Sequence, residues 1–137
     1  MYVPSKYTTS ALYLAGEHHD RGTFLVSPIG NDQVPRSLVI EDNFVVSSDW
    51  KAVFTYSSNQ TLASAETKQH LGLNDAGQLV MRDQPMAEFS LVTDTNGANM
   101  LAFNGNNVFQ VCGDDRIAHE SNCEGGKNVT IAFDQFL

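Results

Sequence analysis

Cys112 and Cys123 are the residues whose type and spacing point most directly to chemistry. They are the two cysteines of the 137-residue chain, and they flank a polar stretch (113–122) with turn-forming residues at both ends. Two strands joined by such a loop bring their Cβ atoms within the range of a disulfide. We therefore predict a Cys112–Cys123 disulfide that stabilises the fold by roughly 2–3 kcal/mol, with two buried free thiols as the alternative. Because structural disulfides persist in oxidising compartments, the pair favours secretion.

Two glycosylation sequons point to the same compartment. Asn59-Gln60-Thr61 and Asn128-Val129-Thr130 both have the N-x-S/T form without proline in the middle position. We expect N-linked glycans at Asn59 and Asn128 on a protein that is secreted and lies outside the cell or in a cell wall.

Aromatic side chains offer a binding chemistry, because their rings stack on the apolar faces of sugars. Trp50 follows Ser47-Ser48-Asp49, a predicted turn, so it would be partly exposed at the start of a strand that also contains Tyr56. Trp50 and Tyr56 are therefore candidate glycan contacts. The alternative is that the lone tryptophan packs in the core, which is the commoner role in small β domains.

No pattern in the sequence indicates catalysis or a resident metal. The chain lacks Gly-x-Ser-x-Gly and a phosphate-binding glycine loop. Neighbouring histidines in His18–Asp20 would point to opposite faces of a strand, so we expect a polar turn there. The carboxylates of Asp114, Asp115, Glu120 and Glu124 lack the spacing of an EF-hand loop, which leaves weak Ca²⁺ binding as an alternative to a solvated loop. We predict no catalytic residue, no metal ligand and no cofactor, with a small secreted hydrolase as a further alternative.

The charge balance argues against two classes of partner. Sixteen acidic residues against eight basic ones give a formal net charge of -8, and the basic residues are scattered singly. Such a surface repels nucleic-acid phosphates and anionic lipid headgroups. We therefore expect neither nucleic acid nor membrane as a partner, and the sequence does not define the oligomeric state.

Short segments of alternating apolar and polar residues run through the chain and predict strands. Glycine- and asparagine-rich turns separate them, and 61–70 is the one stretch that could form a short helix. The length fits one domain. We predict a single all-β domain over 1–137, with about ten to twelve short antiparallel strands in a β-trefoil-like fold or barrel and a β-sandwich as the alternative. The predicted strands are 11–14, 23–26, 37–40, 44–46, 52–56, 71–73, 78–81, 89–92, 100–103, 108–111 and 128–133.

A weak internal repeat favours the trefoil. Leu38–Asp42, Leu71–Asp75 and Leu101–Gly105 each place two apolar residues, one position apart, ahead of a turn. They recur about thirty residues apart, which suits three related units.

The second half of the chain resembles the C-terminal domain of fungal cell-wall proteins. The residues that carry the resemblance are Leu73–Leu79, Phe89–Val92, Phe103–Cys112 and the strand after Cys123. The similar families are the phialide-type wall proteins of moulds and the yeast wall proteins with internal repeats. The resemblance implies a secreted, non-catalytic structural protein of the fungal cell wall or extracellular matrix, with a glycan-binding module for wall polysaccharide as the alternative.

Overall fold

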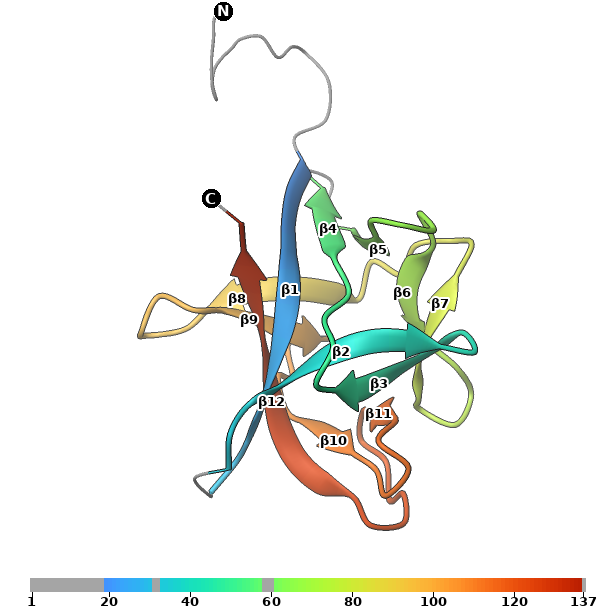
Figure 1. Ribbon diagram of the computed structural model, residues 1–137, viewed down its shortest axis with the longest axis vertical. Helices are drawn as coiled ribbons and strands as arrows, with labels where there is room; N and C mark the ends of the chain where they lie inside the picture. The colour runs from blue at the N-terminus through green and yellow to red at the C-terminus, as the bar shows by residue number, and fades with distance from the viewer. Residues whose placement is uncertain (1–18, 31–32, 58–60, 137) are drawn as a thin grey trace, which may run out of the picture.

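The structure is a computed structural model that describes residues 19–30, 33–57 and 61–136, and these residues form strands joined by turns (Figure 1). The all-β prediction is confirmed, because the described residues contain twelve strands and no helix. The strands are β1 (His19–Pro28), β2 (Arg36–Glu41), β3 (Phe44–Ser48), β4 (Phe54–Ser57), β5 (Leu62–Ser64), β6 (His70–Leu73), β7 (Leu79–Arg82), β8 (Phe89–Thr93), β9 (Asn99–Phe103), β10 (Phe109–Val111), β11 (Ile117–Ala118) and β12 (Lys127–Gln135).

Seven of the strands close into an antiparallel barrel. The order around the barrel is β1–β2–β3–β7–β6–β5–β4, and β4 pairs back onto β1. Strand β12 lies along β1 and also pairs with β9 and β10, which brings the β8–β9 and β10–β11 hairpins against the barrel (Figure 1). A closed barrel removes the exposed edges that a sandwich would leave, so the alternative of a sandwich is wrong.

The strands form three consecutive units of four strands each: β1 to β4, β5 to β8 and β9 to β12. In each unit the two middle strands form a hairpin: β2–β3, β6–β7 and β10–β11. Pairings β4–β5, β8–β9 and β12–β1 join or close the units. The three hairpins also meet one another through Phe44↔Val80, Val46↔Arg116 and Gln78↔Ala118. The three hairpins are arranged as in a β-trefoil, but the pairing of first and fourth strands occurs only in the first and third units, because β8 pairs with β9 alone among the described strands.

The third copy of the repeat lies later in the chain than we predicted. Leu101–Gly105 contributes to β9, whereas the hairpin equivalent to β6–β7 is β10–β11. Each of these two hairpin turns contains an equivalent backbone hydrogen bond. The N–H of Asn74 donates to the carbonyl of Gln78 at 3.0 Å, and the N–H of Cys112 donates to the carbonyl of Arg116 at 2.9 Å. The two hairpins are therefore equivalent in their backbone hydrogen bonds, although the side chains of their turns differ.

Phenylalanines from different units fill the core. The Phe24 ring on β1 lies 4.9 Å from Phe54 and 5.3 Å from Phe133, measured between ring centroids. On β8 and β9, Phe89 and Phe103 form an edge-to-face pair at 4.9 Å. Tilted and edge-to-face pairs are the favoured arrangements of aromatic rings. One continuous cluster of buried side chains therefore connects the three units.

We expect substitution of Ile117 by alanine to lower the free energy of unfolding by about 2–5 kcal/mol. Ile117 is fully buried in the two-residue strand β11, so the loss of its side chain leaves a cavity between the hairpins. Ile29→Ala is the matched control: its side chain is 48% exposed, and we expect a change of about 0.5 kcal/mol or less. Urea unfolding measures both. Equal effects of the two substitutions would show that β11 is not part of the core.

Candidate functional site

The structure joins Cys112 and Cys123 by a disulfide, as the sequence predicted. The two Sγ atoms lie 2.09 Å apart and the two Cα atoms 5.6 Å apart. Cys112 follows β10 and is buried, whereas Cys123 is half-buried and precedes β12. The N–H of Gly113 donates to the carbonyl of Glu124 at 2.8 Å. The covalent bond and this hydrogen bond together hold the β10–β11 hairpin against the start of β12.

Asn128, one of the two predicted glycosylation sites, lies exposed on β12 opposite Gln110 of β10. The Oδ1 atom of Asn128 accepts a hydrogen bond from Nε2 of Gln110 at 3.2 Å. The Nδ2 atom, to which an N-linked sugar attaches, makes no hydrogen bond within the described residues. The geometry therefore leaves the glycosylation prediction open at Asn128. The other predicted site, Asn59, lies outside the described residues.

Trp50 is a surface residue, so the alternative of core packing is wrong. Its side chain is 80% exposed in the segment between β3 and β4. The N–H of Trp50 donates to Oγ of Ser48 at 3.1 Å, the local hydrogen bond by which serine fixes a turn. This turn carries the ring out of the strand and away from the core. Tyr56 on β4 differs, because it is half-buried and packs against the core cluster.

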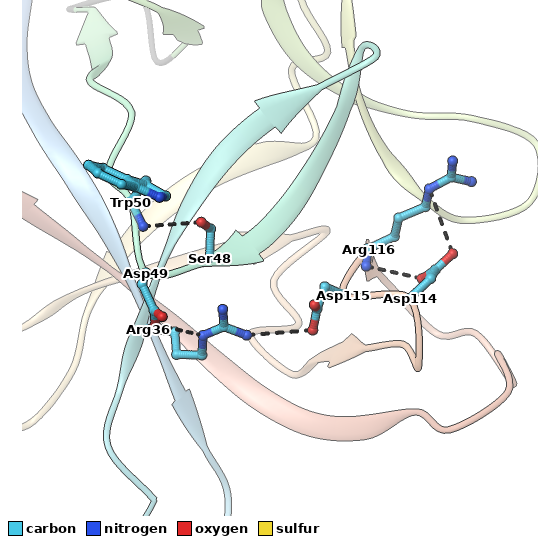
Figure 2. A network of polar contacts seen from close by, with 7 residues as sticks. All are labelled: Arg36, Ser48, Asp49, Trp50, Asp114, Asp115 and Arg116. Atoms are coloured by element: carbon cyan, nitrogen blue, oxygen red, sulfur yellow. Dashed lines mark hydrogen bonds and ion pairs between the residues drawn. The ribbon is translucent and has the colours of Figure 1, made fainter.

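Arg36 connects the Trp50 turn to the β10–β11 turn. Its Nε lies 3.3 Å from Oδ1 of Asp49, and its Nη1 lies 3.5 Å from Oδ1 of Asp115. Figure 2 shows the guanidinium between the two carboxylates, with Trp50 next to Asp49. The three side chains are exposed by 41%, 88% and 56%, so solvent screens the ion pairs. The ion pairs link the Trp50 turn to the β10–β11 turn and contribute little to stability.

The acidic loop that we weighed as a Ca²⁺ site makes contacts of a different kind. Asp115 pairs with Arg36, and Oδ2 of Asp114 lies 3.7 Å from Nε of Arg116. Within 19–30, 33–57 and 61–136, no three His, Cys, Asp or Glu side chains converge as metal ligands would. Asp114 and Asp115 of this loop are therefore paired with arginines.

His119 is a buried polar residue that our sequence analysis did not single out. Its ring packs 5.2 Å from Phe103 and 4.9 Å from Phe109, between centroids, and Nε2 lies 3.4 Å from the carbonyl of Asn106. The enclosing rings give it a structural position. Ile117, Ala118 and His119 are all buried, so no alternation of apolar and polar residues indicates the burial of His119 in the sequence.

Comparison of the chain with protein-family models, with curated proteins and with solved structures finds no match. The part of the chain that the structure describes has no helix of the length and apolar character needed to cross a membrane.

Reduction of the Cys112–Cys123 disulfide should lower the free energy of unfolding by roughly 2–3 kcal/mol, because the bond restricts the unfolded chain. The folded state should persist, since backbone hydrogen bonds also hold the loop. Urea unfolding with and without a reducing agent measures the change. A variant with alanine at both Cys112 and Cys123 is the control and should not respond to the reducing agent. Unchanged stability of the protein after verified reduction would contradict the prediction.

Proposed function

We propose that this chain is a secreted, non-catalytic structural protein of the fungal cell wall or extracellular matrix, and that it holds wall polysaccharide through Trp50. The observation that carries the proposal is the 80% exposure of the Trp50 side chain. Single exposed apolar side chains are common on folded domains, so the exposure matters here because the residue is a tryptophan. Tryptophan also contributes disproportionately to binding energy where it is an exposed anchor.

The surroundings of Trp50 suit a sugar ligand. A pyranose presents an apolar face that can cover an indole ring and hydroxyl groups that both donate and accept hydrogen bonds. Asp49, the residue before Trp50, supplies acceptor oxygens at the same turn, and Arg36 supplies donors. Because Arg36 is held by Asp49 and Asp115, its donors are already oriented before a ligand arrives.

The proposed compartment has separate support. The disulfide favours an oxidising environment, and Asn128 is exposed in a sequon. The resemblance of Phe103–Cys112 and its surroundings to fungal wall proteins suggests which extracellular structure is involved. A hydrolase would need converging carboxylates or a nucleophile with a base, and no observation on the described residues favours that alternative.

Replacement of Trp50 by alanine should weaken binding to wall polysaccharide by about tenfold or more, since the buried face of the ring is lost. Pull-down with insoluble β-glucan, chitin and mannan measures the binding, and Trp50→Phe should retain part of it. Phe136→Ala is the matched control, because Phe136 is an aromatic residue that is 50% exposed elsewhere on the surface. Absence of binding to all three polysaccharides by the unmodified protein, or full binding by Trp50→Ala, would refute the polysaccharide contact.

Secretion from a eukaryotic host should yield protein with an N-linked glycan at Asn128, because the side chain is exposed and its Nδ2 is unoccupied by the protein. Mass spectrometry of peptides before and after enzymatic deglycosylation measures the modification. Asn128→Gln should remove one glycan, and Asn59→Gln should remove another. Asn122→Gln is the control, since Asn122 is exposed but outside any sequon. Unmodified Asn128 in the secreted protein would be the contrary result.

A further inference from the structure

A pocket of about 300 Å³ opens between the first and third units of the fold. It lies where the end of β1, the approach to β2 and the end of β3 face the β10–β11 turn and the start of β12. Its volume is within the range of sites that bind small molecules in proteins. The lining residues are Val26, Pro28, Gln33, Val34, Arg36, Ser47, Val111, Cys112, Gly113, Asp115, Gly125, Lys127 and Val129.

The inner wall of the pocket is apolar and belongs to the paired strands. Val26 and Val129 are almost fully buried, with exposures of 3% and 2%. Pro28 is the cross-strand partner of Val129, and Val111 is the partner of Lys127. Because residues two apart on a strand share a face, Lys127 lies on the same face of β12 as Val129. The partly buried Pro28 and Val111 and the exposed ammonium group of Lys127 therefore line the same side of the pocket.

Lys127 is the cation in this pocket that remains available to a ligand. Arg36 and Asp115 pair with each other at 3.5 Å, and Arg36 also pairs with Asp49. Lys127 is exposed and has no ion-pair partner among the residues that the structure describes. The charged groups of the lining thus leave one uncompensated positive charge at the rim, although the whole chain carries -8.

We propose that this pocket binds a small amphipathic anion, a monocarboxylate whose aliphatic or aromatic body lies against Pro28 and Val111, above the buried Val26 and Val129, and whose carboxylate meets Lys127. Burial of the apolar body supplies the larger part of the affinity. The ion pair with Lys127 orients the ligand and distinguishes it from a neutral molecule of the same shape. Trp50 is not among the lining residues, so this ligand binds at a different place from the polysaccharide proposed at Trp50.

Titration with sodium octanoate, followed by amide and methyl NMR of the full chain, tests the proposal. We expect saturable shifts at Val26, Val111 and Val129. Lys127→Gln should weaken octanoate binding about fivefold, and 1-octanol should bind the unmodified protein more weakly than octanoate does. Lys51→Gln is the matched control, because Lys51 is an exposed lysine outside the lining.

Substitutions at the rim provide a test that does not disturb the core. Val34 is 82% exposed, so Val34→Glu and Val34→Lys should fold equally well. The first should weaken octanoate binding and the second should strengthen it. Absence of shifts at the three valines, equal binding by the two Val34 variants, or equal binding of octanoate and 1-octanol would overturn the proposal. Trp50→Ala should leave octanoate binding unchanged, so this site and the polysaccharide contact can fail separately.

Discussion

The pairing of β1 with β12 is the interaction on which the rest of the structure depends. Its register runs from Gly22↔Gln135 to Pro28↔Val129, and each of the two strands pairs with two further strands. A side chain at Gly22 would collide with the backbone carbonyl of Asp134, so this close approach requires glycine. The two strands lie near opposite ends of the chain (Figure 1). Bringing together two strands so far apart in the sequence costs conformational entropy. Their pairing joins the barrel to the third unit.

The surfaces to which we assign binding lie where the first and third units meet, and weak interactions define them. The N–H of Ser47 donates to the carbonyl of Asp115 at 2.7 Å, beside the ion pair of Arg36 with the same residue. Each exposed ion pair contributes at most about 1 kcal/mol. Their effect is positional: together with the Ser47–Asp115 hydrogen bond, they link the Trp50 turn to the β10–β11 turn.

Most strands could be predicted from the sequence, because alternation over four or more residues is visible in it. Strands β5 and β11 were missed, since Leu62–Ser64 and Ile117–Ala118 are too short to show a period. The third repeat was misplaced for a related reason, because the turn beginning at Cys112 shares only backbone hydrogen bonds with the turn beginning at Asn74. The disulfide was predictable from spacing. The exposure of Trp50 was predictable only in part, because the preceding serines indicate a turn but not the direction of the ring.

The pocket could not be predicted from the sequence, since its lining comes from segments at both ends of the fold. The disulfide, however, helps to explain one wall. A Cβ atom at Gly125 would lie 3.0 Å from the Cα of Gly113, and Gly125 has a φ of +72°, so this close approach favours glycine at 125. Cys112, next to Gly113, is covalently tied to the segment that contains Gly125. The disulfide therefore adds a covalent link to the pairing of β10 with β12, and this pairing places Lys127 opposite Val111 in the wall of the pocket.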